Sequence, residues 1–388
     1  MDRRKFLGLS ALAGASVAVA PQLTMASAKA KKENEKFPTR MLGNTGMEIP
    51  ILSMGVMRAD NPAVVRAAYN SGITHFDTAN GYQRGKNEEM LGAFFKDKDR
   101  STFTIATKAS AKPNAENFEQ DFEELLNTSL SRLQMDYVDI FYVHGIDNLE
   151  DFHHPRLIAQ LKKFKAEGKV KHIGFSTHAN KPAQIDEAIK AGIFEVILLS
   201  YNFKLGILPE LNAAIQRGVD AGIGFVAMKS MAGGVEDADG KKIVDGAACL
   251  RWTWQNPNIT TAIPGFTSFD FLDNCLEAAR SPELQASDIH YLAGLQNNQL
   301  LYCQNCGQCV ANCQKHLATI PTLMRAYMYN YGYRQPALAK ETLAGLPLTG
   351  SECKGCVTCS VHCPSGFNVA DKIAAITPIV HVPDSFLA

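Results

Sequence analysis

The chain has 388 residues, with 39 Lys or Arg, 39 Asp or Glu, and 46% hydrophobic residues. This composition is typical of a globular protein of more than one domain and excludes a disordered chain or a collagen-like repeat. Residues 1–36 hold seven Lys or Arg and three Asp or Glu, so the remainder is mildly acidic. We therefore expect no binding to nucleic acid through charge.

The first 28 residues have the features of an export signal. Arg3 and Arg4 precede an uncharged stretch at 8–19 and a small-residue cleavage pattern at 26–28, which resembles a twin-arginine signal peptide. A retained membrane anchor is the alternative, but the apolar run is shorter than the roughly 20 residues of a bilayer span. We expect cleavage, a polar linker at 29–37, no stable membrane span afterwards, and a periplasmic protein exported in the folded state.

Residues 38–280 alternate short apolar or β-branched runs with amphipathic stretches such as 157–166 and 182–191. Eight such strand–helix units predict a (β/α)8 TIM barrel. An open doubly wound sheet is the competitor, but the first strand leads into Gly55-Val56-Met57-Arg58 rather than the Gly-rich turn of a dinucleotide-binding fold. The candidate strands are 51–54, 74–77, 103–107, 137–143, 172–175, 196–199, 224–228 and 260–263.

Four polar residues follow the carboxyl ends of these predicted strands, where barrel enzymes carry their chemistry. Asp77, Lys108 and His144 end the second, third and fourth strands, and Tyr82 lies five residues after Asp77. Each alone also suits a structural role: a helix cap, a solvated terminus, a core imidazole and a loop anchor. Four together at matching ends favour a catalytic group.

The motifs around these residues resemble the aldo-keto reductases. They are His-Phe-Asp-Thr-Ala-Asn-Gly-Tyr at 75–82, Asn-Glu-Glu-Met-Leu-Gly at 87–92, Ile-Ala-Thr-Lys at 105–108 and Asp-Ile-Phe-Tyr-Val-His at 139–144, with shorter matches at 173–176, 200–202 and 263–265. The resemblance covers 38–280. It implies an oxidoreductase that acts on a small-molecule carbonyl or alcohol with an Asp, Tyr, Lys and His tetrad, all four of which are present.

The chemistry of the tetrad follows from its groups. Hydride transfer to a carbonyl builds negative charge on its oxygen, so a proton donor must stand there. Tyr82 would be this general acid, and the Lys108 ammonium would lower its pKa. Asp77 would orient Lys108, and His144 would donate a hydrogen bond to the carbonyl.

The resemblance also implies NAD(P)H, although several of the family's contacts are replaced. Ser176 is retained, but Thr177 stands for Asn, Leu198 for Gln and Met228 for the ring that stacks on nicotinamide. No basic residue occupies the positions that grip the 2′-phosphate of NADP, so we expect no preference for NADP. The expected nucleotide contacts are Ser176, Thr177, Met228, Lys229, Met231, Gly265, Thr267 and Ser268.

Eight of the ten cysteines fall between 303 and 363, in two runs of the form C-x2-C-x2-C-x3-C. In two-cluster ferredoxins the fourth cysteine of each run binds the other cluster. The spacing therefore predicts two [4Fe–4S] clusters in a domain at 281–388. Zinc is the rival metal. The usual pattern has a proline directly after the fourth cysteine; Pro364 fills this position after the second run, but Gln314 fills it after the first. The expected ligands are Cys303, Cys306, Cys309 and Cys363 for one cluster and Cys353, Cys356, Cys359 and Cys313 for the other.

Helices are expected between the two runs, at 320–331 and 336–344, and this insert resembles the helical two-cluster ferredoxin domain fused to some bacterial aldo-keto reductases. The four tyrosines at 327, 329, 331 and 333 suit packing better than an electron relay. Cys249 and Cys275 are expected to be ordinary buried thiols.

These features predict an exported redox enzyme. Either its nucleotide is carried out tightly bound, or the clusters transfer electrons from a redox partner protein, or the clusters only stabilise the fold. Nicotinamide moves two electrons and a cluster moves one, and no flavin motif lies between them. The alternative is an exported electron-transfer protein whose barrel is a non-catalytic docking scaffold. The intact tetrad favours the enzyme, and the replaced nicotinamide contacts favour the scaffold.

Overall fold

The computed structural model describes residues 37–146, 148–178, 180–233, 235–236, 242–243, 245–295, 302–317, 319–344, 346–349, 352–353, 356 and 358–387. The predicted signal peptide at 1–28 and all but the last residue of the predicted linker lie outside this part of the chain. Residues 38–388 form one compact unit.

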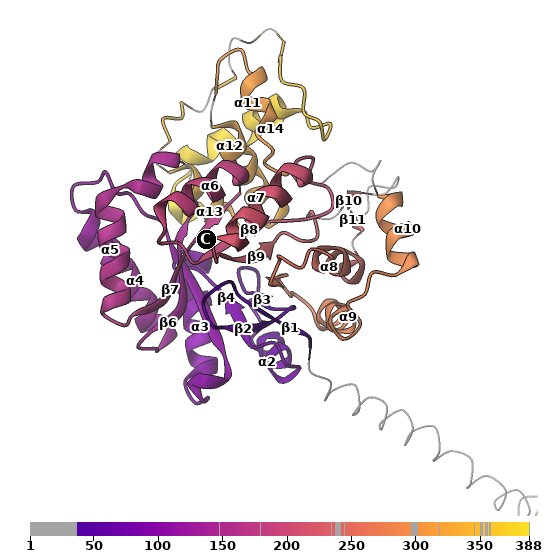
Figure 1. Cartoon of the computed structure of the whole chain (residues 1–388). Helices are drawn as coiled ribbons and strands as arrows, with labels where there is room; N and C mark the ends of the chain where they lie inside the picture. The colour runs from indigo at the N-terminus through magenta and orange to yellow at the C-terminus, as the bar shows by residue number, and fades with distance from the viewer. Residues whose placement is uncertain are drawn as a thin grey trace, which may run out of the picture. The chain divides into compact units, whose positions relative to one another are not determined.

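Eight parallel strands form the barrel, as the sequence predicts (Figure 1). They pair in the order β12-β9-β8-β7-β6-β5-β4-β3, and a parallel bridge between Leu52 and Ala262 joins the two ends of the sheet. Each predicted strand overlaps an observed one, although the first and last are only two residues long. The strands are β3 Met54–Gly55, β4 His75–Asp77, β5 Thr104–Ala109, β6 Val138–His144, β7 Val170–Thr177, β8 Val196–Ser200, β9 Gly224–Met228 and β12 Thr261–Ala262.

Helices alternate with these strands because their apolar residues recur on one face. In α4, Phe122 and Leu126 are one turn apart and both buried, and the Phe122 ring packs against Phe141 of β6 and Phe164 of α5. The helices of the barrel are α2 Pro62–Asn70, α3 Lys86–Phe95, α4 Phe118–Leu133, α5 Pro155–Ala166, α6 Lys181–Ala191, α7 Leu208–Asp220, α8 Gly246–Trp254 and α9 Phe269–Arg280.

A hairpin that the sequence analysis did not predict covers the amino-terminal end of the barrel. It consists of β1 Thr39–Met41 and β2 Glu48–Pro50. Leu42 and Ile49 are fully buried and belong to the same apolar core as Ala106 and Leu198 inside the barrel. The hairpin thus closes the end opposite to the predicted tetrad.

The C-terminal segment is mainly helical. It contains α10 Ala286–Gly294, α11 Gln308–Asn312, α12 Ile320–Tyr327, α13 Pro336–Leu343 and α14 Val369–Ile376. The helix expected at 320–331 is α12 followed by a π-helical turn at Met328–Gly332. Short 3-10 turns at Thr377–His381 and Asp384–Phe386 end the described chain.

This segment shares an apolar core with the barrel. Ala248 and Cys249 of α8 lie in the same buried core as Leu323 of α12 and Ile373 of α14. Cys249 and Cys275 are both buried thiols, as expected.

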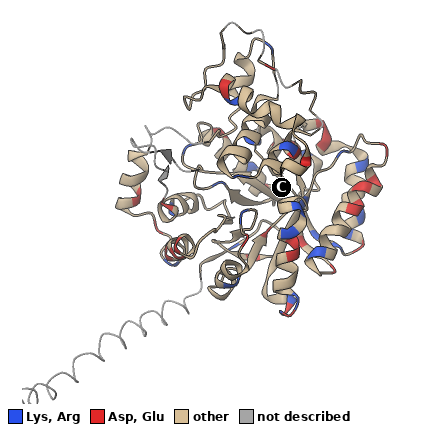
Figure 2. Ribbon diagram, turned by 180° about the vertical axis from the view of Figure 1, so that it is seen from behind, with Lys and Arg blue, Asp and Glu red and all other residues tan. Residues whose placement is uncertain are grey.

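Acidic and basic residues alternate on the outer helices of the barrel, as Figure 2 shows. On α4 and α5 they form ion pairs such as Glu119 with Arg156 and Glu123 with Lys163. Among the described residues, no helix is both long and apolar enough to cross a bilayer.

Candidate active site

The barrel brings the four predicted tetrad residues to one end of the sheet. Asp77 ends β4, His144 ends β6, and Lys108 lies near the end of β5. Tyr82 begins a 3-10 turn in the loop after β4. The parallel register of β4, β5 and β6 is what places these carboxyl ends together.

Asp77 and Lys108 form a buried ion pair. The Lys108 Nζ donates to Asp77 Oδ1 at 2.6 Å and to the Thr78 carbonyl oxygen at 2.5 Å. The Lys108 side chain is 1% exposed and that of Asp77 is 4% exposed. Burial raises the pKa of Asp77 and lowers that of Lys108, and each charge opposes the shift of the other.

Tyr82 lies beside this pair. The Lys108 Nζ is 4.8 Å from the centroid of the Tyr82 ring, and the His144 ring packs edge-on against the same ring at 6.0 Å. The expectation that Lys108 lowers the pKa of this phenol stays a prediction. In the structure, burial raises the pKa of Tyr82 well above its usual value, and the charge of Asp77 adds to this.

His144 is a neutral imidazole. Burial, together with the positive charges of Lys108 and Arg325, lowers its pKa to about 3. A neutral ring still has one N–H that can donate a hydrogen bond. The expected role of His144 as a donor to a carbonyl therefore agrees with its surroundings.

The loop that carries Tyr82 is fixed by side chains of the motif at 87–92. Asn87 is fully buried, accepts from the Thr78 hydroxyl at 2.8 Å and donates to the Val56 carbonyl oxygen at 2.7 Å. Glu88 is also fully buried and accepts from the Thr107 hydroxyl at 2.6 Å. These two residues hold the loops after β3 and β4 against β5.

A cavity of about 810 Å³ opens over the tetrad. Its wall includes Tyr82 and His144 of the barrel together with Arg325 and Tyr329 of the C-terminal segment. The Arg325 guanidinium lies 3.4 Å from Nδ1 of His178, whose pKa is lowered well below the usual value chiefly by burial. The site is therefore made of both parts of the chain.

Sequence reasoning missed the contribution of this segment. It assigned no role to His178 and did not consider Arg325, because no motif marks either residue and they are 147 positions apart. The tyrosine run was a usable signal, since Tyr329 is buried and lies in the cavity wall.

The predicted nucleotide contacts fall into two groups. At the nicotinamide end, the Ser176 hydroxyl accepts from the Gly145 N–H at 3.2 Å, and Ser176 and Thr177 are buried. Met228 packs against the core inside the barrel, and Met231 packs against the core of the C-terminal segment.

At the phosphate end, Thr267 and Ser268 are exposed and Gly265 is partly buried. The Ser268 hydroxyl caps α9 by accepting from the Phe271 N–H at 3.3 Å. A Cβ on Gly265 would lie 3.4 Å from the carbonyl oxygen of Gly55, so the two loops lie close together.

These residues do not fit a complete nicotinamide site. Leu198, in place of a polar partner for the carboxamide, is fully buried in the barrel core. The C-terminal segment covers the loop after β9, where the Gln304 amide donates to the Ala232 carbonyl oxygen at 3.1 Å. We therefore derive no step through a nicotinamide nucleotide.

The described thiols fall into the two sets that the crossing rule predicts. Cys303 and Cys309 interact electrostatically with Cys306 and Cys363, and burial raises their pKa values to about 11 and about 12. Cys353 interacts in the same way with Cys356, Cys359 and Cys313. A cavity of about 300 Å³ is lined by all four cysteines of this second set.

Each set supplies four thiolates, a donor set that suits a [4Fe–4S] cluster and also a tetrahedral zinc ion. Among the residues that the structure describes, no three His, Cys, Asp or Glu side chains converge on one point that could hold a single metal ion.

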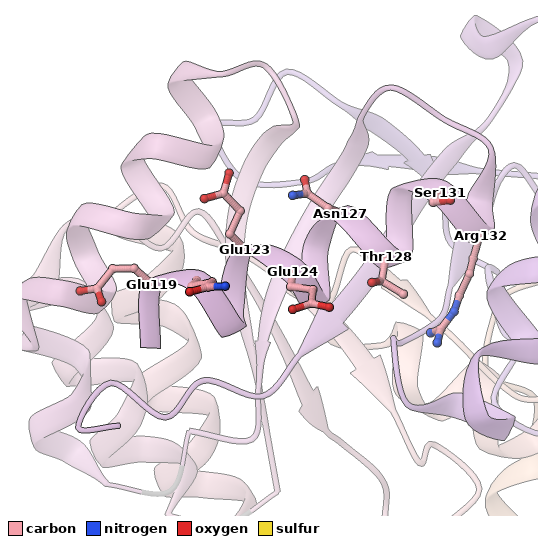
Figure 3. A pocket seen from close by; sticks show the side chains of 8 residues that line it. Glu119, Glu123, Glu124, Asn127, Thr128, Ser131 and Arg132 are labelled. Carbon is pink, nitrogen blue, oxygen red and sulfur yellow. The ribbon is translucent and has the colours of Figure 1, made fainter. Parts of the chain in front are cut away.

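Another depression, of about 770 Å³, runs along the outer face of α4 (Figure 3). Its lining is polar and includes Glu123, Glu124 and Arg132. None of the tetrad residues takes part, so we place the chemistry in the cavity over the tetrad.

Comparison with known proteins agrees with this geometry. Residues 46–243, about half of the chain, match the aldo/keto reductase family. The chain belongs to the aldo/keto reductase family. Residues 302–368 of this aldo/keto reductase match a 4Fe-4S dicluster domain, so both predicted families are confirmed.

Curated relatives resemble only part of this reductase. It is 29% identical to a probable aldo-keto reductase from Glycine max, over 48% of this chain and 61% of that protein. It is 34% identical to L-galactose dehydrogenase from Arabidopsis thaliana, over 36% of this chain and 49% of that protein. The chain thus spans about half to three fifths of the length of these relatives.

Solved structures show the same fold. An aldo-keto reductase from Bacillus halodurans superposes with a TM-score of 0.56 at 22% identity, over 67% of this chain and 96% of that one. A putative aldo-keto reductase from Pseudomonas aeruginosa gives 0.54 at 19% identity, over 65% and 98%. The (β/α)8 barrel is therefore confirmed.

Proposed function

We propose that the barrel interconverts a carbonyl and an alcohol on a small molecule bound in the cavity over the tetrad, with Tyr82 as the general acid and base. The observation that carries this proposal is the buried Asp77–Lys108 pair beside Tyr82, at the base of a cavity that His144 also lines. A buried, unpaired ammonium would be costly. Asp77 keeps it charged and in place.

Reduction of the carbonyl takes two electrons and two protons. In this direction a reduced partner protein supplies both electrons, solvent supplies the proton on the carbon, and the Tyr82 hydroxyl donates its proton to the carbonyl oxygen as charge develops there. The raised pKa of this phenol keeps it protonated at neutral pH, which suits a proton donor. The neutral His144 N–H can orient the same oxygen. The Lys108 ammonium then stabilises the phenolate until solvent returns the proton.

The eight cysteines of the two runs would hold two [4Fe–4S] clusters in the sets described above. When bound, such clusters supply one-electron transfer. The family's usual nucleotide is not part of this mechanism, because the nicotinamide end of its site is incomplete. A redox partner protein that exchanges electrons with the C-terminal segment is part of the proposal.

Replacing Tyr82 with Phe tests the proposed role. The ring still packs against His144, but the proton donor is lost, so turnover should fall by roughly 10²–10⁴ with little change in stability. Turnover is measured anaerobically as alcohol formed from a carbonyl panel, with dithionite, NADH or NADPH as the reductant. Tyr331→Phe is the matched control, because Tyr331 is 43% exposed and its hydroxyl only donates to the Ala375 carbonyl oxygen. Equal rates for Tyr82→Phe and the parent would refute the assignment.

A second candidate is an electron-transfer protein whose barrel is a docking scaffold. The replaced residues at the nicotinamide end support it. Such a protein would keep both clusters reducible while the whole carbonyl and alcohol panel gives no product.

We also propose that the protein is exported to the periplasm by the twin-arginine route. The paired arginines at 3 and 4 and the small residues at 26–28 support this. Replacing both arginines with lysine should retain the protein in the cytoplasm, as cell fractionation would detect.

A further inference from the structure

Two lysines of the barrel rim lie buried or partly buried without an acidic partner. Lys181, at the start of α6, is fully buried, and its Nζ donates to the His178 carbonyl oxygen and the Ser200 hydroxyl, each at 3.2 Å. Lys229, just after β9, is partly buried, and its Nζ lies 6.0 Å from the Tyr329 ring centroid. Neither forms an ion pair with a carboxylate among the residues that the structure describes.

Such charges are costly to bury unless a negative group compensates them. The groups nearest to them that become negative as cluster ligands are thiols of the first cysteine run. Burial lowers the pKa of Lys181 to about 8 and that of Lys229 to about 7, and the opposing contributions come from Cys306 and Cys303 for Lys181 and from Cys303 for Lys229. Arg325 adds a third positive charge next to Lys229.

Hydrogen bonds fix the first run against the same rim. The Asn202 amide, after β8, donates to the Lys229 carbonyl oxygen at 3.2 Å and to Gln304 Oε1 at 2.9 Å. The Gln304 amide in turn donates to the Ala232 carbonyl oxygen. Gln304 directly follows Cys303, so the run is tied to the loops after β8 and β9.

Close packing beside Gln304 makes this docking specific. A Cβ on Gly233, whose φ is +81°, would lie 2.4 Å from the Tyr302 ring, and a Cβ on Gly332 would lie 2.3 Å from it. A larger residue at either position would require the Tyr302 ring to move.

The second set of cysteines has a different setting. Cys356 and Cys359 are exposed, and the cavity that this set lines also contains Lys315. The two sets therefore face different surroundings, one the barrel rim and the other solvent.

We propose that Lys181 and Lys229 compensate the negative charge of the cluster bound by the first set, and that they raise its reduction potential above the value it would have without them. A cluster bound by four thiolates is negatively charged and gains one more negative charge on reduction, so nearby ammonium groups favour the reduced form. We call the cluster of the first set the inner cluster and that of the second set the outer cluster. The inner cluster is the one beside the cavity, because Lys181 also donates to the carbonyl oxygen of His178, which lines the cavity wall.

An electron that enters at the second set can pass to the first. That step oxidises the outer cluster, reduces the inner one, and makes or breaks no covalent bond. The proposal rests on the proposed function only for the reaction to which the inner cluster would deliver electrons. The effect of the two lysines on the reduction potential can be tested without turnover.

The test is a redox titration of the full chain, purified anaerobically with its iron, and followed by low-temperature electron spin resonance. Lys181→Met and Lys229→Met should each make reduction of one cluster less favourable by about tenfold, which is 59 mV for one electron. Lys181→Arg keeps the charge and should restore most of the loss. Lys315→Met is the matched control and should lower the potential of the other cluster only.

Two results would overturn the proposal. One is that neither Lys181→Met nor Lys229→Met shifts either potential while Lys315→Met does. The other is that these variants and Lys315→Met shift the same signal. Iron content and melting temperature show whether each variant is folded. If Lys181→Met does not fold, the potential of Lys229→Met decides between the two outcomes. The outcome does not depend on Tyr82→Phe, so this proposal and the proposed function can fail separately.

Discussion

The Asp77–Lys108 pair allows a stability prediction that can be separated from activity. In Asp77→Asn, the carboxylate charge is lost but the side chain keeps its shape. At 2.6 Å, two unit charges attract each other by about 6 kcal/mol if the effective dielectric constant is about 20. Because the Lys108 ammonium stays buried and loses this compensation, we expect the free energy of unfolding to fall by about 3–5 kcal/mol.

Two further variants show whether this loss of stability comes from the uncompensated Lys108 charge. Asp77→Asn with Lys108→Met removes both charges and should be more stable than Asp77→Asn alone, since no buried ion remains. Asp186→Asn is the matched surface control. Asp186 pairs with Arg217 at 2.8 Å, but their side chains are 38% and 51% exposed, so the cost should be at most about 1 kcal/mol.

The assay is chemical unfolding of the iron-loaded protein under anaerobic conditions, followed by far-ultraviolet circular dichroism. A single variant Asp77→Asn that is as stable as Asp186→Asn would refute the reasoning. So would a double variant that is less stable than Asp77→Asn, because the loss would then come from packing rather than from charge.

Three more predictions concern pH, ligands and cofactor. Burial lowers the pKa of His75 to about 4 and that of His144 to about 3, from 6.5. Because the unfolded chain then binds more protons, the contribution of these two histidines to the free energy of unfolding is fully present above pH 6.5 and should be lost as the pH drops toward 4. His75→Gln should make this loss smaller, as unfolding measured at a series of pH values would show. Cys363→Ser should remove iron from the first cluster set while Cys249→Ser keeps the full content, and equal iron in both would disprove the crossing of the fourth ligands. Residues 264–271 contain no Lys or Arg, so calorimetry should give NADPH no advantage over NADH, and tenfold tighter NADPH would contradict this.

The barrel was predictable because its signals are local. Each strand is a short apolar run, and the parallel order of such runs fixes which ends meet, so the positions of Asp77, Lys108 and His144 followed from spacing alone. The hairpin at the other end was missed because its strands have three residues each, too few to show alternation.

The other half of the cavity could not be predicted in this way. Arg325 reaches His178 only because the C-terminal segment folds back over the barrel rim, and no periodicity in either segment encodes that contact. The raised pKa of Tyr82 has a related origin. The sequence places a lysine and an aspartate near the phenol, but it does not show how deeply the phenol is buried.

The apolar core shared by α8, α12 and α14 limits how this protein can be divided or recombined. A fragment that ends at residue 280 would leave Ala248 and Cys249 without the rest of the apolar core to which they belong, including Leu323 and Ile373. The iron–sulfur segment, cut free, would lose the same surface and also the barrel loops that hold Gln304. Transplanting it onto another barrel would therefore require the matching residues of α8 and of the loops after β8 and β9 to be transferred with it.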